Sequence, residues 1–320
     1  MIGRDIDRAA TLLTQGEVVA IPTETVYGLA GNALNQAAVT RIFAVKNRPA
    51  FNPLITHTDS WEKVQAYVQS VPPVAQQLAK RFWPGPLTLL LPKTDRIPDI
   101  VTAGLDRVAV RIPRHPMTLQ LLAQLDFPLA APSANPFGYI SPTEATHVAD
   151  QLGEKIPYIL DGGTCAVGVE STIVGFEEEK VVVYRWGGVS QEALETVVGS
   201  RKVTFYQSPV TMSHPMAPGM LRSHYAPRQK VVIGNPTELL PQYALSEVGV
   251  MAFQIACPQL PPHRQVVLSE AGDLAEAAQR LFAALRTLEK MPIRFILAEP
   301  VPDVGLGRAI NDRLRRAAAE

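Results

Sequence analysis

Apolar and polar positions in the first sixty residues predict a strand, a polar turn, a helix and a second strand. Residues 18–21 are continuously apolar, which is typical of a buried strand, and a second apolar run ends at His57. The turn at residues 23–25 carries two hydroxyls and a carboxylate, and the periodicity predicts a helix over residues 35–45. These elements bring polar side chains to one edge of a sheet, where open α/β sheets usually bind ligands.

The other elements of the first two hundred residues follow from the same periodicities. Ser141, Pro142 and Glu144 match the start of a helix, with Ser141 as its N-cap. Prolines bracket the apolar run 87–91, so we expect that strand to stay out of the centre of a sheet. We expect further helices over residues 6–15, 73–82 and 116–124, and strands over residues 108–112, 128–131, 157–160, 171–176 and 181–186.

The order of these elements predicts the fold class and the domains. Helices and strands mix without a strict βαβ rhythm, which favours an α/β (α+β) fold with a curved mixed sheet and helices packed on it. After about residue 200 the pattern fades, and the order strand, helix, strand, strand, helix, strand, helix then predicts a small Rossmann-like α/β domain. We divide the chain into an N-terminal domain (1–205), a linker or lid (206–229) and a C-terminal domain (230–320).

The composition is that of a globular protein without a general affinity for nucleic acid. Of 320 residues 47% are hydrophobic, and thirty Lys and Arg balance thirty Asp and Glu. Zero net charge lacks the electrostatic signature of a dedicated nucleic-acid binder, although a local basic patch stays open. No apolar run is long enough to span a bilayer and the first residues are not a signal peptide, so we expect a cytoplasmic protein.

Several common sites are absent from the sequence. It has no GxxxxGK[ST] phosphate loop, and Gly305 and Gly307 lie too near the end of the chain to open a dinucleotide-binding unit. Cys165 and Cys257 match no disulfide or zinc spacing, and we expect them to be buried apolar residues in a reducing compartment. No catalytic triad stands out either, so we expect chemistry without a covalent enzyme nucleophile.

Polar residues after the first predicted helix are candidates for a site. Lys46 and Arg48 follow it directly, where the helix dipole by itself favours cations. Asn52 and His57 lie on the same path, which makes a ligand site the alternative. Arg111 alternates with apolar residues in its strand and points to the opposite face, toward a site or a surface salt bridge.

Other candidates lie at strand ends. Ser133 and Asn135 leave an apolar strand, where they either cap a turn or bind a ligand. Ser171 enters a later strand from the segment GVEST, and Arg185 ends the strand after it. From the residues alone, the structural and the ligand-binding interpretations both stay open.

Taken in order, the motifs of the chain resemble one family. They are PTETVYGL, KNRP followed by NPLITH, FWPGPLTLLL, VAVRIP, APSAN, GVESTIV, YRWG, HPMAPGMLRSHYAP and GLGRAINDRLRRAA. They resemble the threonylcarbamoyl-AMP synthases, a YrdC-like family, in its long two-domain form, over nearly the whole chain. That resemblance implies that L-threonine, bicarbonate or carbon dioxide, and ATP are joined into threonylcarbamoyl-AMP with release of pyrophosphate, the first step toward N6-threonylcarbamoyladenosine in tRNA.

The resemblance also implies roles for individual residues. The Lys-x-Arg pair of the family falls on Lys46 and Arg48, which would be catalytic, and its Ser-x-Asn pair falls on Ser133 and Asn135. Position 107 departs from the family, which usually has a short polar residue there. The implied L-threonine site is Thr25, His57, Arg111, Ala131 and Ser171, and the implied ATP site is Arg48, Asn52, Arg107, Ser133, Asn135, Ser141, Arg185 and Tyr225.

Cofactors and partners follow from the same resemblance. It implies Mg²⁺ held through the phosphates of ATP, no metal ligand from the protein and no organic cofactor. It further implies a separate downstream tRNA threonylcarbamoyl transferase, weak tRNA binding at most, and no membrane.

Two rival functions and one open segment remain from the sequence. A carbamoyl-adenylate former of the hydrogenase-maturation type shares the Lys-x-Arg and Ser-x-Asn pairs, but such proteins carry acylphosphatase and zinc-finger segments that this chain lacks. A non-catalytic RNA-binding module is the other rival. The linker is either a spacer or a lid that excludes water from the hydrolysable product.

Overall fold

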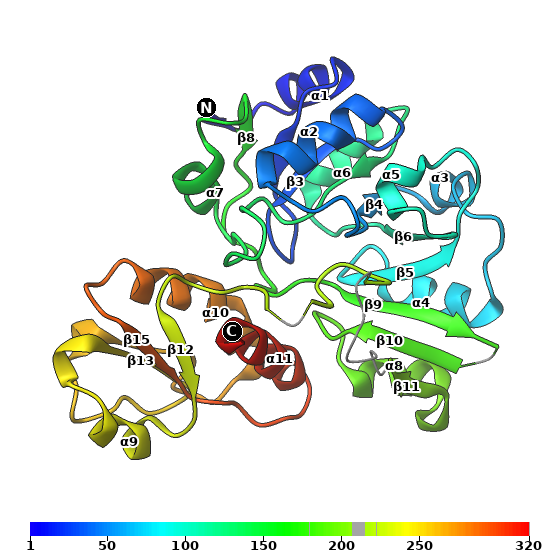
Figure 1. Cartoon of the computed structure of the whole chain (residues 1–320). Helices are drawn as coiled ribbons and strands as arrows, with labels where there is room; N and C mark the ends of the chain where they lie inside the picture. Colours follow the sequence, from blue (N-terminus) through cyan, green and yellow to red (C-terminus); the bar gives the residue numbers. More distant parts are fainter. Residues whose placement is uncertain (179, 207–214, 222, 320) are drawn as a thin grey trace.

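The chain folds around two separate β-sheets (Figure 1). The computed structural model describes residues 1–320 except 179, 207–214, 222 and 320. Within these residues a mixed sheet of eleven strands organises the N-terminal domain, and a parallel sheet of four strands organises the C-terminal domain. The predicted mixed α/β architecture is therefore confirmed.

The large sheet combines parallel and antiparallel neighbours. Its strand order is β1-β8-β2-β3-β7-β4-β6-β5-β9-β10-β11. The last two strands expected for this part of the chain, β9 and β10, form a hairpin and pair antiparallel. The strands are β1 (Ile2–Gly3), β2 (Val19–Ile21), β3 (Gly28–Asn32), β4 (Ile55–His57), β5 (Leu87–Pro92), β6 (Arg107–Arg111), β7 (Leu129–Ala130), β8 (Tyr158–Leu160), β9 (Thr172–Glu177), β10 (Lys180–Arg185) and β11 (Val203–Phe205).

Helices cover both faces of this sheet. Val19 and Ile21 of β2 pack into one apolar cluster with residues of α1 and α6, whereas Ala20 packs into another with residues of α2 and α4. Burial on both faces explains why the run around β2 is continuously apolar. The helices are α1 (Ile6–Thr14), α2 (Gln36–Lys46), α3 (Trp61–Gln65), α4 (Pro73–Phe82), α5 (Asp99–Thr102), α6 (Pro116–Ala123), α7 (Ala145–Leu152), α8 (Gln191–Val198) and the 3₁₀ turn Ser200–Lys202.

The strand β3 was not predicted from the sequence. Its sequence GLAGN contains two glycines, which are depleted in strands, and it follows the polar turn directly. It nevertheless pairs antiparallel with β2 on one side and with β7 on the other. Gly31 leaves room for α2, because a Cβ atom there would lie 3.1 Å from Ile42 Cδ1.

The expectation that prolines keep β5 out of the centre of the sheet is wrong. This strand lies inside the sheet, antiparallel to β6 and parallel to β9. The prolines are tolerated because they lie at its ends. Pro92 is the last paired residue, and Pro86 contributes only its carbonyl oxygen, which accepts from Thr172 N at 3.0 Å.

The predicted helix start at Ser141 is also wrong, since α7 begins at Ala145 after Glu144. Tertiary hydrogen bonds hold the preceding residues in an extended path. Ser141 Oγ donates to Glu170 Oε1 at 2.5 Å, and the Pro142 carbonyl accepts from Tyr27 N at 2.8 Å. These bonds outweigh the local capping-box preference, because each connects this segment to another part of the fold.

The C-terminal domain is a four-stranded parallel sheet with the order β12-β15-β13-β14. Asp273 caps its long helix, accepting from Ala275 N at 2.6 Å. The elements are β12 (Lys230–Ile233), α9 (Pro236–Leu239), the 3₁₀ turns Leu240–Gln242, Leu245–Glu247 and Pro262–Arg264, β13 (Val248–Ala252), β14 (Gln265–Val267), α10 (Leu274–Glu289), β15 (Phe295–Ala298) and α11 (Gly307–Ala318).

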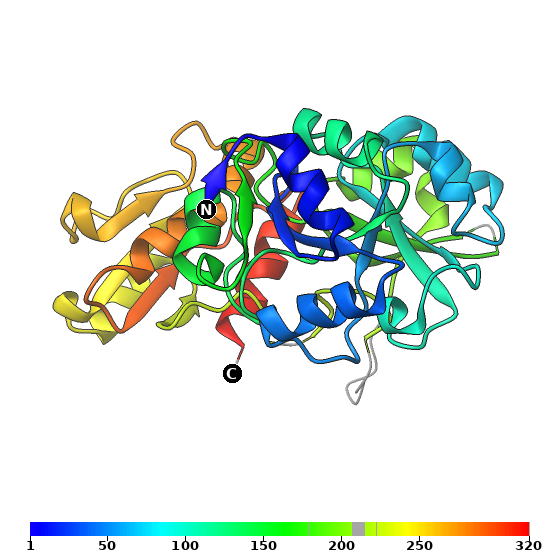
Figure 2. The ribbon, with the colours of Figure 1, turned by 90° about the horizontal axis from the view of Figure 1, so that it is seen from above.

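The two domains share an apolar core. Both α10 and α11 lie between the small sheet and the N-terminal domain (Figures 1 and 2). One buried cluster joins Phe282 of α10 and Leu314 of α11 to Val26, Val169 and Tyr225 from loops around the large sheet. Because buried apolar area stabilises contacts in proportion to its size, this cluster fixes α11 next to those loops.

Two further expectations concern the whole chain. Cys165 and Cys257 are both free and buried, as predicted. Among the described residues, no helix has the length and apolar character needed to cross a bilayer.

Candidate active site

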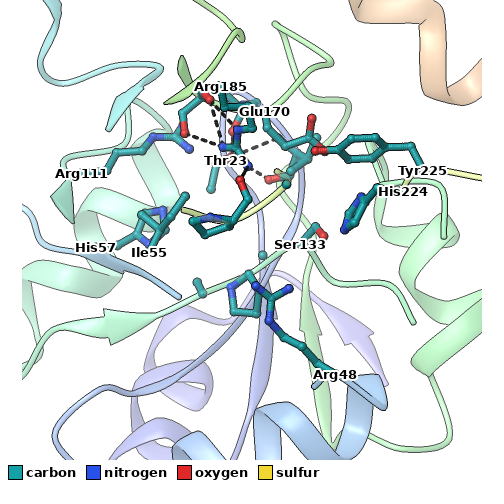
Figure 3. Close-up of a pocket in the computed structure, with 18 residues that line it drawn as sticks. Thr23, Arg48, Ile55, His57, Arg111, Ser133, Glu170, Arg185, His224 and Tyr225 are labelled. Carbon is teal, nitrogen blue, oxygen red and sulfur yellow. Dashed lines mark hydrogen bonds between the residues drawn. The ribbon is translucent and has the colours of Figure 1, made fainter. Parts of the chain in front are cut away.

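A cavity lies where the strand ends of the large sheet meet the linker (Figure 3). The space inside it is about 560 Å³ when the open solvent at its mouth is included. The residues around it come from β-strand ends, their following loops and the segment before β12. They are Thr23, Thr25, Val26, Gly28, Arg48, Ile55, His57, Arg111, Ala131, Pro132, Ser133, Glu170, Ser171, Arg185, Pro218, Gly219, His224 and Tyr225.

Hydroxyl groups and a neutral imidazole line one part of the cavity. Thr23 Oγ1 accepts from the backbone N–H groups of Thr25 and Val26, at 3.1 and 3.2 Å, which fixes the polar turn. His57 is buried at the end of β4, and burial followed by the nearby Arg111 lowers its pKa to about 3. The ring is therefore uncharged near neutral pH. Its Nδ1 has no hydrogen-bond partner among the described residues.

Arg48 reaches the cavity from the loop after α2. Its Nη2 donates to Asn52 Oδ1 at 2.7 Å and to the Pro53 carbonyl at 2.8 Å, and its guanidinium carbon lies 5.7 Å from the centre of the Phe137 ring. Burial lowers the pKa of Arg48 to about 9, so it stays a cation at neutral pH. Asn52 thus orients Arg48 and does not itself line the cavity.

Lys46 is buried behind the cavity. Its Nζ donates to the Ser133 carbonyl at 2.6 Å and to the Asn135 carbonyl, while Phe137 N donates to the Lys46 carbonyl at 2.8 Å. Asn135 in turn donates from Nδ2 to the Tyr139 carbonyl at 2.9 Å. These bonds hold the loop after β7, so Lys46 and Asn135 shape the site from behind while Ser133 lines it.

Arg111, at the end of β6, forms a buried ion pair. Its Nη2 lies 2.8 Å from Glu24 Oε1, and its Nε donates to the Gly85 carbonyl at 3.1 Å. The second carboxylate oxygen of Glu24 accepts from Arg114 N at 3.0 Å. The surface salt bridge considered from the sequence is therefore an interior pair that directs Arg111 into the cavity.

Arg185 closes another side. It donates from Nε and Nη2 to the Ser171 carbonyl at 3.1 and 2.9 Å, and from Nη1 to the Pro218 carbonyl at 3.2 Å. Ser171 Oγ is also 2.7 Å from Thr88 Oγ1. Burial lowers the pKa of Arg185, although Tyr225 and Glu170 oppose the shift.

The segment before β12 supplies the remaining wall. Tyr225 is fully buried in a left-handed conformation, and its ring centre lies 4.1 Å from that of His224. Gly219, with φ of 80°, lets the chain approach, because a Cβ atom there would lie 2.7 Å from Tyr225 Oη. The part of the linker that the structure describes therefore covers the cavity, whereas residues 207–214 and 222 lie outside the described residues.

Nine of the fourteen site residues named from the sequence line the cavity. Lys46, Asn52, Asn135 and Ser141 contact lining residues or their loops from behind. Arg107 is at the opposite end of β6 from Arg111, beside Pro92, and does not line the cavity.

Five lining residues with evident chemical or steric roles were not among those named. Thr23 and Glu170 belong to motifs singled out above, PTETVYGL and GVESTIV, yet nothing in their spacing shows which polar residue of a motif faces inward. His224, Pro218 and Gly219 come from the aperiodic linker. Only the composition of the linker could have pointed to these three residues, because His, Gly and Pro are concentrated in that segment.

The charges suit an anionic ligand. Three guanidinium groups, those of Arg48, Arg111 and Arg185, face one lining carboxylate, Glu170. Arginine binds carboxylates and phosphates through two parallel hydrogen bonds. Among the described residues no three His, Cys, Asp or Glu side chains are grouped to hold a metal ion. The cavity can therefore bind a molecule with several anionic groups at separate points.

Family models and known proteins match the chain along nearly its whole length. Residues 11–187 match the Sua5/YciO/YrdC family model, described as telomere recombination, and residues 189–319 match the model described as threonylcarbamoyl-AMP synthase, C-terminal domain. The threonylcarbamoyl-AMP synthase of Pyrococcus abyssi is 42% identical over 97% of this chain and 93% of its own. That of Bacillus subtilis is 41% identical over 98% and 92%.

A solved structure agrees with these matches. The crystal structure of P. abyssi Sua5 complexed with L-threonine is 40% identical, with a TM-score of 0.92 over 99% of this chain and 97% of that one. The two family models, the full-length relatives and the similar fold thus all indicate the same family. The chain belongs to the threonylcarbamoyl-AMP synthase family.

Proposed function

We propose that this enzyme joins L-threonine, bicarbonate or carbon dioxide, and ATP into threonylcarbamoyl-AMP and pyrophosphate. The observation that carries the proposal is the cavity in which Arg48, Arg111 and Arg185 converge beside a neutral imidazole. One cation suits the amino-acid carboxylate and the other two suit the phosphates of a nucleotide. Full-length relatives named threonylcarbamoyl-AMP synthase support the same activity.

L-Threonine fits the end of the cavity near β4 and β6. Arg111 is held at Nε by the Gly85 carbonyl and at Nη2 by Glu24, so its guanidinium is preorganised for the substrate carboxylate. Thr25, His57 and Ser171 offer small polar groups nearby, and Ala131 an apolar surface for the methyl group. The L-threonine bound to the related Sua5 of P. abyssi supports this assignment of the substrate.

ATP fits the other end, between Arg48, Ser133 and Arg185. Tyr225 and His224 offer aromatic surface there. Lys46, Asn52 and Asn135 would act through the loops they hold, and Ser141 through Glu170. Arg107 lies too far along β6 to line the cavity, so we propose no nucleotide contact for it.

The chemistry requires charge stabilisation rather than a protein nucleophile. The amine of threonine attacks the carbon of carbon dioxide and loses a proton, giving a carbamate. With bicarbonate the same attack also breaks a C–O bond, and the oxygen leaves as water. A carbamate oxygen then attacks the α-phosphorus of ATP as the bond to the pyrophosphate oxygen breaks, so this single step makes the mixed anhydride and makes the enzyme a nucleotidyltransferase. Negative charge builds on the phosphoryl oxygens and on the leaving group, where fixed cations lower the barrier.

Mg²⁺ would enter with ATP. The lining offers a single carboxylate, Glu170, and both its oxygens already accept hydrogen bonds from Ser141 and Arg313. These residues fit a metal ion that is held by phosphates and water rather than by the protein. When bound, Mg²⁺ would supply positive charge to the phosphates of ATP. We propose no organic cofactor.

The decisive experiment is pyrophosphate release by the purified protein with Mg²⁺, ATP and bicarbonate. We expect release with L-threonine and little with L-serine, L-valine or no amino acid. Stimulation by carbamoyl phosphate instead of threonine would favour carbamoyl chemistry. Absence of turnover under every condition would overturn the proposal and favour a binding role.

The product implies a partner and a compartment. A mixed anhydride hydrolyses readily, so we propose a separate cytoplasmic tRNA threonylcarbamoyl transferase that consumes it soon after release. Direct binding of tRNA by this chain should be weak and should fall steeply with salt. Tight, salt-insensitive tRNA binding would contradict that part of the proposal.

A further inference from the structure

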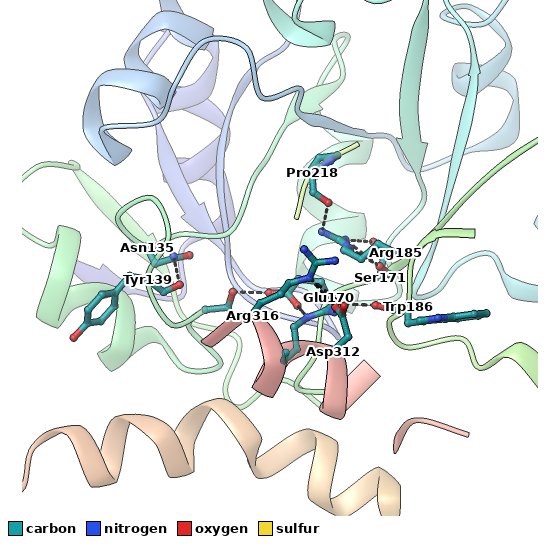
Figure 4. Close-up of polar contacts among 11 residues, drawn as sticks. Asn135, Tyr139, Glu170, Ser171, Arg185, Trp186, Pro218, Asp312 and Arg316 are labelled. Atoms are coloured by element: carbon teal, nitrogen blue, oxygen red, sulfur yellow. Dashed lines mark hydrogen bonds and ion pairs between the residues drawn. The ribbon is translucent and has the colours of Figure 1, made fainter. Parts of the chain in front are cut away.

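Arg313, on the C-terminal helix α11, is fully buried and contacts the wall of the cavity. Figure 4 shows Glu170 of that wall and Trp186 beside Asp312 and Arg316 of the helix. Its Nε donates to Glu170 Oε2 at 2.7 Å and its Nη2 to the Trp186 carbonyl at 2.9 Å. Its guanidinium carbon also lies 4.9 Å from the centre of the Tyr225 ring, within cation–π distance. One side chain of the C-terminal domain therefore contacts the lining residues Glu170 and Tyr225.

Neighbouring residues of α11 hold Arg313 and the linker. Asp312 Oδ2 lies 2.6 Å from Arg313 Nη1, and both its oxygens lie 3.1 Å from Arg316 Nε. Arg316 Nη1 donates to the Leu221 carbonyl, and its own carbonyl accepts from His224 N at 3.2 Å. The helix thus positions the backbone of the linker as well as the two lining side chains.

We propose that Arg313 is a positioning residue of the active site. Through it the C-terminal domain keeps the Glu170 carboxylate ion-paired and holds Tyr225 in place at the nucleotide end of the cavity. The assignment of that end to a nucleotide rests on the proposed function. The Arg313–Glu170 pair itself is a property of the structure. The C-terminal domain would then be part of the catalytic unit and not only an attached module.

The negative charge of Glu170 explains why its ion pair with Arg313 should affect ATP binding. Burial alone would raise the pKa of Glu170, but Arg313, Arg185 and the Ser141 hydroxyl together hold it below its usual value, so the group is an anion. Without Arg313 an unpaired carboxylate would face the phosphates of ATP and compete with them for Arg185. Removing one partner of a buried ion pair leaves just such an uncompensated charge.

Arg308 provides a matched control on the same helix. It also forms an ion pair across the two domains, with Glu192 at the start of α8, but neither residue lines the cavity. A role in domain docking alone would be shared by both arginines. Of these two arginines, only Arg313 contacts residues that line the cavity.

The test compares Arg313→Met with Arg308→Met in the full-length protein. The first readout is the equilibrium affinity for ATP with Mg²⁺, measured by calorimetry, and the second is pyrophosphate release with L-threonine. We expect Arg313→Met to weaken ATP binding at least about tenfold, since hydrogen bonds to charged groups are among the stronger ones. We expect Arg308→Met to bind ATP like the wild type, and the KM for L-threonine to change little in either variant.

A second substitution separates the electrostatic effect from a loss of structure. In the double variant Glu170→Gln/Arg313→Met both charges are removed, a change that buried ion pairs often tolerate. We expect it to bind ATP more tightly than Arg313→Met alone. We further expect the ATP affinity of Arg313→Lys, which keeps the charge, to stay closer to that of the wild type than the affinity of Arg313→Met does. If Arg313→Met does not fold, the test compares the ATP affinities of Arg313→Lys and of the double variant with that of the wild type.

The outcomes are distinguishable. Wild-type ATP affinity in Arg313→Met, equal losses in both arginine variants, or no recovery in the double variant would overturn the positioning role. ATP binding that depends on Arg313 in a protein that releases no pyrophosphate with L-threonine would support this role and contradict the proposed reaction.

Discussion

Lys46 Nζ donates to the carbonyl oxygen of Ser133 at 2.6 Å, which ties the end of α2 to the loop that follows β7. The lysine is buried, and burial followed by the nearby Arg48 lowers its pKa well below the usual value. Its position indicates that it acts on the cavity by fixing the Ser133 loop.

Replacing Lys46 with Ala should therefore affect both catalysis and stability. Loss of one preorganised group of an active site typically costs about 2.7 to 4 kcal/mol, so we expect kcat/KM to fall about a hundredfold or more. We also expect a lower urea midpoint, because the carbonyls of Ser133 and Asn135 lose a buried donor. Lys80→Ala, at an exposed position of α4, is the control in both assays. Normal turnover in Lys46→Ala would remove it from the site.

Arg48→Ala should reduce catalysis without the same loss of loop order. Its guanidinium lines the cavity directly, so we expect kcat/KM to fall about a hundredfold or more. Asn52→Ala removes the oxygen that accepts from Arg48 Nη2 at 2.7 Å and should cause a smaller loss of the same kind. Pyrophosphate release measures both, and Arg41→Ala, at an exposed position of α2, should match the wild type.

Arg111→Lys tests the amino-acid end of the cavity. Lysine keeps the charge but cannot make two parallel hydrogen bonds to a carboxylate. We expect the KM for L-threonine to rise about tenfold, which corresponds to the loss of one charged hydrogen bond, while the KM for ATP stays near its wild-type value. The neighbouring Arg114→Lys, with an exposed side chain, serves as the control. A selective rise in the KM for ATP would reverse the proposed arrangement of the two substrates.

Most of the large elements could be predicted from the sequence, because their signals are local. The boundaries of α4 and the apolar runs of β2 and β4 follow directly from periodicity. Local signals failed where tertiary contacts decide. Ser141 reads as a helix cap, but it binds Glu170 from a distant segment.

The site shows the same division. Residues at strand ends, such as Ser133 and Arg185, could be named as candidates for one sheet edge because ligands gather where strands end. The contact of Arg313 with Glu170 could not, since no sequence pattern relates two residues 143 positions apart. The resemblance to the family indicated Tyr225 as a site residue, but only the structure shows that it contacts Arg313 on α11.

His57 should make the free energy of unfolding decrease as pH falls below neutral. Burial and Arg111 lower its pKa to about 3 in the folded protein, against about 6.5 for an exposed histidine. Between these values the unfolded chain binds a proton that the folded chain does not, so this contribution is present above pH 6.5 and is lost as pH falls. At pH 5 the loss is about 2 kcal/mol.

Urea unfolding at pH 7 and pH 5 measures this effect. We expect the wild type to lose about 2 kcal/mol more between the two pH values than His57→Gln does. His263→Gln, at an exposed position, should lose as much as the wild type. Equal losses in wild type and His57→Gln would show that His57 is not the group responsible.

Gly219→Ala tests whether the linker seals the cavity. A Cβ atom at this position would lie 2.7 Å from Tyr225 Oη and 3.0 Å from Arg185 Cδ, so we expect the substitution to displace the wall they form. Water would then reach the mixed anhydride, and AMP should accumulate faster relative to pyrophosphate than in the wild type. Gly199→Ala is the control, because Gly199 has a similar φ of 88° but open space around it. Backbone strain is common to both variants, so excess AMP in Gly219→Ala alone would support a sealing role, whereas equal AMP ratios in the two would reduce the linker to a tether.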